Sequence, residues 1–186
     1  LIQIVLAQES KRLGLANKPV LVVPNHMLEA FAGEYLRAFP RAKVLAASKD
    51  DMQGEARGTL LMRIAVNDWD AVIMTHSTFG KIHVGSDRVK AMIEEVKCQA
   101  RVSVMGVDDR NLVREAQRAA IQAENTLKGL IRGDQDAGLP GFEQLGVDML
   151  LVDEADLFKN LYFFTRKKRI PGINSAVSQR AMDLFV

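Results

Sequence analysis

Residues 147–156 have the sequence VDMLLVDEAD, in which a short apolar run leads directly into an acidic cluster. The largely apolar part, Val147–Val152, predicts a strand, and the continuous β-branched run Val20–Val23 is typical of a strand that is buried on both faces, as in a parallel sheet. A similar run occurs at Ala71–Thr75, and a further strand is predicted over Lys43–Ala47. Strands spaced in this way, with helices between them, predict an α/β fold with a parallel sheet.

Helical periodicity is found in residues 1–13, 28–39 and 59–66, which precede or separate the predicted strands. In the first of these segments Leu1 and Val5, like Ile2 and Leu6, are four residues apart and share a face of the predicted helix. The alternation of strands and helices is that of consecutive βαβ units.

Residues 87–131 are helical in character throughout and interrupt this alternation. Apolar residues recur every seven positions, at Val89, Val96, Val113, Ala120 and Leu127. A break near Met105–Asp109 predicts two antiparallel helices. We interpret the pair as a helical hairpin inserted into the α/β domain, and two ordinary amphipathic surface helices are the alternative.

The composition is that of an ordinary globular protein, with 48% hydrophobic and 26% charged residues among 186, which excludes a disordered or collagen-like chain. The formal net charge of +2 does not by itself indicate a nucleic-acid partner. The single cysteine, Cys98, excludes an intrachain disulfide and a cysteine-based zinc site. No apolar run approaches the roughly 20 residues that cross a bilayer, so no membrane partner is expected.

Both ends of the chain lie inside apolar patterns, at Leu1–Ala7 and Ala181–Val186. Natural domain ends are usually polar and loosely held, so we expect a fragment of a longer protein, truncated at both ends. The first segment has no basic leader and no cleavage site, and no signal peptide is expected there.

The chemistry is expected where the last predicted strand ends, at Asp153 and Glu154. Ligands of open α/β sheets bind outside the carboxyl ends of the strands. One carboxylate there can hold Mg²⁺, and its neighbour can orient or deprotonate the water that attacks a γ-phosphate. The alternative is that the acidic pair forms a solvated turn.

Polar residues also follow the two other buried runs. Pro24, Asn25 and His26 come after one of them, and Thr75 and His76 are found at the end of the other. Free backbone N–H groups at the start of a helix bind phosphate. The alternative is that Asn25 caps the next helix and that the residues after Thr75 form a simple turn.

One dense basic run, Arg166–Arg169, includes Lys167 and Lys168. It can contact phosphate, or it can be a solvated loop.

Three segments together resemble the superfamily 2 helicases. Val152–Leu161 is similar to motif II, the Walker B or DEAD/DEAH box, with a Lys159-Asn160 pair of the Snf2 type. Lys18–Phe39 resembles motif Ia, and Asp68–Phe79 resembles motif Ib. The motifs occur in the family's order and cover most of the chain. The chain is most similar to the Snf2-like helicases of phages and mobile bacterial elements, which are often fused to a DNA methylase.

The resemblance implies a RecA-like lobe of the P-loop NTPase type, which in the parent protein hydrolyses ATP with Mg²⁺ to move along or remodel DNA. Asp153 would hold Mg²⁺ and Glu154 would activate the water. Asp156 would also lie at the nucleotide and would couple ATP hydrolysis to the DNA-binding side of the lobe. Lys159 and Asn160 would support this coupling.

The resemblance also implies partners. Pro24, Asn25, His26, Thr75 and His76 would contact the DNA backbone, together with Lys159, Asn160, Lys167 and Lys168. The DNA is expected to be duplex and bound without sequence preference. A second RecA-like lobe and a fused methylase domain would belong to the same parent. The implied location is the cytoplasm of a bacterium, or of the host for a phage protein.

Departures from the family pattern limit what the chain is expected to do alone. The Walker A sequence G-x-x-x-x-G-K-[ST] is absent, since the one Gly-Lys pair, Gly80-Lys81, is followed by Ile82. Motif III and the second lobe are absent too. We therefore expect residues 1–186 to be a partial ATP-binding lobe with motifs Ia, Ib and II, inactive by itself, with residues 87–131 inserted in it.

Two other functions remain open from the sequence. The chain could be a non-enzymatic DNA-binding or interaction module built on a degenerate helicase lobe. It could also be an unrelated α/β protein that uses the acidic pair for another metal-dependent phosphoryl reaction.

Overall fold

The computed structural model describes residues 1–105, 110–128, 138–158 and 184. The chain divides into two compact units. The sheet unit comprises residues 1–83 and 134–155, and the helical unit comprises residues 84–133 and 156–186.

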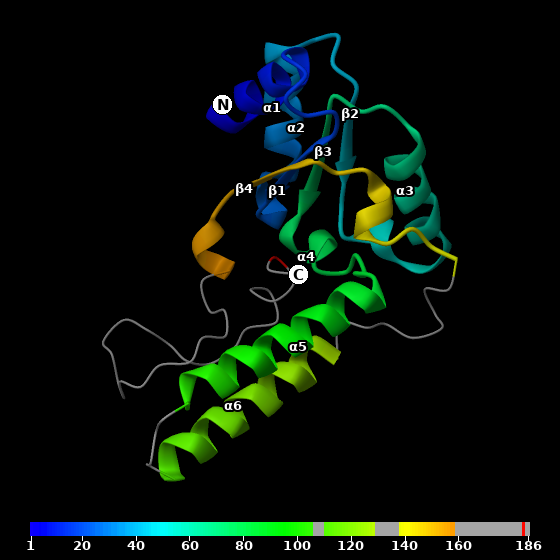
Figure 1. The fold of residues 1–186 in the computed structure, drawn as a ribbon. Coiled ribbons are helices and arrows are strands. Elements are labelled where there is room, and N and C mark those ends of the chain that lie inside the picture. Colours follow the sequence, from blue (N-terminus) through cyan, green and yellow to red (C-terminus); the bar gives the residue numbers. More distant parts are fainter. Residues whose placement is uncertain (106–109, 129–137, 159–183, 185–186) are drawn as a thin grey trace. The chain divides into compact units, whose positions relative to one another are not determined.

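A parallel sheet forms the centre of the sheet unit (Figure 1). Its four strands are β1 (Pro19–Val23), β2 (Val44–Ala47), β3 (Ala71–Thr75) and β4 (Met149–Val152), in the spatial order β2-β3-β1-β4. All three pairings are parallel. The predicted α/β parallel sheet is confirmed, and the arrangement is consistent with a RecA-like lobe.

The continuous apolar runs occupy the middle of this sheet. Both β1 and β3 are buried along their whole length, because each has a strand on either side and helices above and below. The last strand begins at Met149, two residues later than predicted. Asp148 instead turns its carboxylate toward the entry of β1, where it accepts the backbone N–H groups of Asn17 and Lys18 at 2.6 and 2.9 Å.

Two helices, α1 (Ile2–Arg12) and α2 (Leu28–Ala38), cover one face of the sheet. Their contact with the sheet is a cluster of apolar side chains, made of Ile4, Ala7, Leu21, Val23, Leu28, Phe31, Tyr35, Ala71 and Ile73. The helix predicted over residues 1–13 is confirmed as α1, although Leu1 is 70% and Val5 41% exposed. The helix has apolar residues on more than one side, and the sheet covers only the stripe that contains the small Ala7.

The helix α3 (Gly54–Val66) lies on the other side of the sheet from α1 and α2 (Figure 1). It begins five residues before the predicted start at Thr59. Lys18 holds its last turn, because the Lys18 Nζ donates to the carbonyl oxygens of Ile64 and Ala65 at 2.7 and 3.1 Å. A third hydrogen bond of 3.0 Å reaches the carbonyl oxygen of Leu145. Burial of the ammonium group lowers the pKa of Lys18.

The helical unit contains α5 (Ser86–Ser103) and α6 (Arg110–Lys128), which run antiparallel and pack on each other (Figure 1). Their shared core is made of Val89, Met92, Ile93, Val96, Ala123 and Leu127. Lys97 joins the two helices by a 3.3 Å ion pair with Glu124. That the pair is an insertion into a helicase lobe, residues 87–131, stays a prediction.

Short helical segments complete the described chain: η1 (Asn25–Met27), η2 (Asp50–Met52), α4 (His76–Phe79), η4 (Phe142–Leu145) and η5 (Ala155–Phe158). Within the described ranges, no helix combines the length and the apolar character needed to cross a membrane.

Candidate functional site

The candidate site is the edge of the sheet at which all four parallel strands end. The sequence continues there as Asn25 after β1, Ser48 after β2, His76 after β3 and Asp153 after β4. Because the strands are parallel, segments that are far apart in the chain meet at this edge. Two of the predicted nucleotide residues, Asp153 and Glu154, therefore share one edge of the sheet unit with the predicted DNA residues that follow β1 and β3.

The short helix α4 links the ends of the three other strands, each through a different residue. His76 Nε2 lies 2.9 Å from the carbonyl oxygen of Asp153, after β4. The Ser77 hydroxyl donates to the Asn25 side-chain oxygen at 2.9 Å, after β1. The Thr78 hydroxyl donates to the carbonyl oxygen of Ser48 at 3.0 Å, after β2. Three consecutive side chains thus fix the edge as one connected polar layer.

Thr75 fixes the start of α4. Its hydroxyl oxygen accepts the backbone N–H of Thr78 at 3.1 Å, which is an N-cap interaction. It also lies 2.9 Å from the Ser77 hydroxyl and 2.8 Å from the Thr78 hydroxyl. Thr75 is buried, so its hydroxyl group forms hydrogen bonds within the polar layer and does not face the solvent.

The loop after β2 has its own anchor at this edge. The carboxylate of Asp51 accepts the Ser48 hydroxyl and the Ser48 backbone N–H, both at 2.7 Å. These hydrogen bonds lower the pKa of Asp51, the side-chain bond contributing most. Sequence reasoning missed Ser48 and Asp51, although a Ser-x-x-Asp pattern directly after a predicted strand was a signal that could have found them.

The acidic turn, Asp153-Glu154, begins where β4 ends. The Asp153 N–H donates to the carbonyl oxygen of Val22 at 2.8 Å, which continues the ladder between β4 and β1 by one residue. Glu154 then takes φ = 53°, and it is the one non-glycine residue with positive φ in the described chain. Such a conformation costs about 1–2 kcal/mol and concentrates at functional sites.

This turn presents its two carboxylates differently. Asp153 is half-buried and Glu154 is exposed. Carboxylate oxygens are hard ligands that suit Mg²⁺, which is held by one or two carboxylates together with water and substrate phosphates. The donor set of the turn therefore fits Mg²⁺. No group of three or more acidic, histidine or cysteine side chains able to hold a metal by itself occurs among the described residues.

In the loop after β1, Asn25 does not cap the following helix, which was the alternative to a phosphate-binding role. Asn25 opens the short helix η1, and α2 starts only at Leu28. Neither helix has a side-chain cap, and Asn25 instead accepts the Ser77 hydroxyl. Asn25 and His26 are exposed and Pro24 is half-buried, so this loop is accessible from solvent.

The remaining predicted site residues belong to the helical unit. Asp156 is exposed in η5 and belongs to the helical unit. Lys159, Asn160, Lys167 and Lys168 lie outside the described residues. The roles predicted for these five residues stay predictions.

The Gly80-Lys81 pair does not form a phosphate-binding loop before a long helix. Gly80 ends the four-residue α4, and the carbonyl oxygen of Lys81 accepts a hydrogen bond of 3.1 Å from Arg57. A Walker A loop needs a strand before it and a helix after it, with its amides facing the phosphates. The described structure agrees with the sequence that this pair is not a Walker A element.

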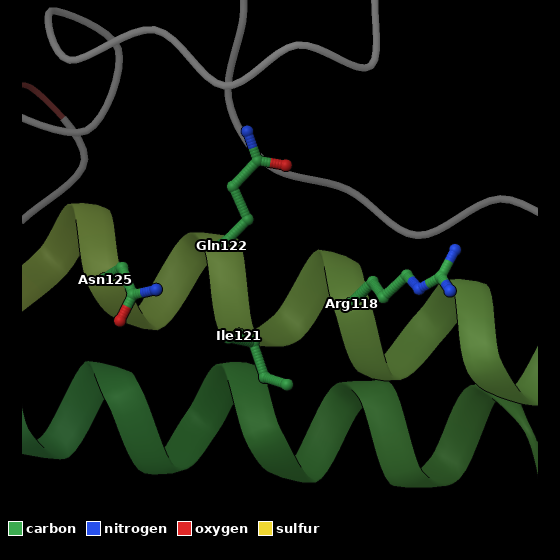
Figure 2. A pocket seen from close by; sticks show the side chains of 4 residues that line it. All are labelled: Arg118, Ile121, Gln122 and Asn125. Atoms are coloured by element: carbon green, nitrogen blue, oxygen red, sulfur yellow. The ribbon is translucent and has the colours of Figure 1, made fainter.

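Two surface pockets are lined by residues other than those of the candidate site. One lies at the amino ends of β2 and β3 and is lined by Gln8, Ala38, Phe39, Pro40, Arg41, Ala42 and Asp70. The other lies on α6 and is lined by Arg118, Ile121, Gln122 and Asn125 (Figure 2).

A family model described as a probable helicase domain matches residues 1–186, the whole chain, and the chain therefore belongs to this family. No curated protein and no solved structure matches the chain.

Proposed function

We propose that this helicase domain is the ATP-binding lobe of an ATP-dependent DNA helicase or translocase of the Snf2-like type. In this proposal the parent protein supplies the Walker A loop and a second RecA-like lobe. The observation that carries the proposal is the acidic turn. The half-buried outermost strand β4 ends in Asp153-Glu154, where the carboxyl ends of the parallel strands meet, and the Asp153 carbonyl oxygen is hydrogen bonded to His76 at the start of α4.

The two carboxylates have separate roles. Asp153, which is half-buried and held by the Val22 carbonyl, would ligate Mg²⁺. Bound Mg²⁺ would offset the charge that develops on the transferred phosphoryl group. Glu154, on the exposed side of the turn, would accept a proton from the attacking water. The left-handed backbone at Glu154 turns it away from the strand direction, so that consecutive residues need not point to opposite faces.

The exposed loop Asn25-His26, with Ser77 behind it, would contact the phosphate backbone of duplex DNA without reading its sequence. His76 is buried, with 6% of its surface exposed, and is directed toward Asp153. It is therefore proposed to connect the DNA edge to the acidic turn rather than to touch DNA. A phage or mobile-element origin, with a fused methylase and a cytoplasmic location, remains part of the same proposal.

The proposal predicts different results for the two acidic residues in Mg-ATP binding by the parent protein. Asp153→Asn should weaken Mg-ATP binding, because an amide is a poorer Mg²⁺ ligand than a carboxylate. Glu154→Gln should leave binding largely in place, since affinity comes from the P-loop and the metal. Titration calorimetry with Mg²⁺ present, repeated with EDTA, measures both variants. Equal affinities for Asp153→Asn and the unmodified protein would contradict the assignment of Asp153.

A second candidate function rests on the absence of G-x-x-x-x-G-K-[ST] from residues 1–186. Without this loop the chain lacks the main triphosphate anchor, as a non-enzymatic DNA-binding module on a degenerate lobe would. ATP hydrolysis by the parent protein separates the two functions: the motor requires it, and the module does not show it.

A further inference from the structure

The outer side of α6 carries a row of basic and amide side chains. Arg110, Arg114 and Arg118 are spaced four residues apart, and Gln122 and Asn125 extend the row by one more turn. Residues at this spacing lie along one face of a helix. All five are exposed. We call this set the arginine stripe.

The opposite side of α6 packs against α5. Ala116, Ala120, Ala123 and Leu127 are buried there, with at most 9% of their surface exposed. The stripe therefore points away from the only packing surface that α6 has in the described helical unit. Figure 2 shows Gln122 extending from the side of α6 away from α5, with Arg118 extending along the helix.

The arginines of the stripe have no acidic partner among the described residues. The ion pairs of this helix involve Glu124, which is shared by Lys97 and Lys128. No described carboxylate lies within ion-pair distance of the three arginines. Like charges four residues apart destabilise a helix by about 0.2–0.5 kcal/mol per pair, so the stripe costs stability unless an anion binds to it.

The spacing of the stripe suits a polyanion. Eight residues of α-helix rise about 12 Å between Arg110 and Arg118, and one strand of duplex DNA presents three to four phosphates over that length. Guanidinium groups bind phosphate in a bidentate manner, and amides such as those of Gln122 and Asn125 add neutral phosphate contacts. The pocket lined by Arg118, Ile121, Gln122 and Asn125 continues the stripe as a shallow depression, in which the exposed Ile121 lies beside the polar side chains.

We propose that the arginine stripe of α6 is a second duplex-DNA-binding surface, which contacts the phosphate backbone independently of the sheet edge. The proposal rests on the proposed DNA function for the choice of polyanion. It does not depend on ATP hydrolysis or on the acidic turn.

The test uses the chain of residues 1–186 and a short fluorescent duplex, with binding followed by fluorescence anisotropy between about 50 and 200 mM salt. The test variant replaces Arg110, Arg114 and Arg118 with Gln. The negative slope of log affinity against log salt should become shallower by about 2 to 3 units, since each lost phosphate contact removes roughly 0.9 from its magnitude. Helix content by circular dichroism should not fall, because the three side chains are exposed.

The control removes the same charge elsewhere. Arg12, Arg37 and Arg41 are exposed on the sheet unit, and their joint replacement by Gln should change the slope by less than about one unit. Equal slopes for the two triple variants, or no binding by the unmodified chain at low salt, would overturn the proposal. So would a stripe variant that loses binding to anionic phosphatidylserine vesicles but keeps its binding to DNA. If the stripe variant binds DNA like the unmodified chain while the parent protein still shows DNA-dependent ATP hydrolysis, the DNA-binding role of the stripe is wrong and the proposed motor function is unaffected.

Discussion

At the scale of single residues, the hydrogen bond from His76 to the Asp153 carbonyl oxygen joins the segment after β3 to the acidic turn after β4. A carbonyl oxygen can only accept a hydrogen bond, so the Nε2 atom that faces Asp153 carries the proton. The carbonyl that it holds belongs to the first residue of the acidic turn, next to the left-handed Glu154. Loss of this donor would free a strained turn to relax.

We therefore expect His76→Leu and His76→Gln to behave differently, since Gln places a donor N–H near the position of Nε2 and Leu does not. His76→Leu should speed amide hydrogen exchange at Asp153–Ala155 and lower the free energy of unfolding by about 1–2 kcal/mol. His76→Gln should recover most of both effects. Hydrogen exchange followed by mass spectrometry, with thermal unfolding alongside, measures them.

If the two variants exchange equally fast at the turn, His76 acts only by filling space in the buried edge, and its positioning role is wrong.

At the scale of secondary-structure elements, the far end of the sheet unit is held by Lys18 rather than by apolar packing alone. One buried ammonium group ends α3 and also binds the carbonyl oxygen of Leu145, just before β4. Cations are favourable at the carboxyl end of a helix, where the last carbonyl groups lack partners. This fixes α3 against the strands whose other ends carry the candidate site.

Lys18→Met should destabilise the fold by about 2–3 kcal/mol, because it leaves buried carbonyl groups without a charged donor while keeping the side-chain volume. Lys43→Met, the same change at an exposed position, should stay within about 0.5 kcal/mol. Urea unfolding of the chain measures both. A cost for Lys18→Met no larger than that for Lys43→Met would show that water replaces the ammonium group without penalty.

The elements also show how far sequence reasoning reaches. The strands β1 and β3 were predicted almost to the residue, because a continuous apolar run between breaking residues has few other folded states. Which residues of α1 are buried could not be predicted, since apolar residues lie on several sides of this helix and only the sheet decides which are covered. The links from α4 could not be predicted either, because His76 and Asp153 are 77 residues apart and meet only through the strand order.

At the scale of the whole molecule, the family match shows a helicase domain and the parallel α/β sheet is consistent with it, while the proposed motor function rests on the acidic turn. The sequence placed Asp153 and Glu154 correctly after a strand, because a parallel sheet puts that position at its carboxyl edge. It could not predict the left-handed conformation of Glu154, which follows directly after the hydrogen bonds of Asp153 to β1 and α4.

The measurement that tests the motor function most directly is DNA-stimulated ATP hydrolysis by the parent protein, compared between Glu154→Gln and a matched control, Glu55→Gln. Glu55 is exposed in the first turn of α3 and has no role in the proposed site. Loss of a general base typically lowers the rate by about 10²- to 10⁴-fold, so Glu154→Gln should lose turnover by that factor while Glu55→Gln hydrolyses ATP normally. If Glu154→Gln retains near-normal turnover, the acidic turn is not a Walker B element, and the proposed motor function fails with it.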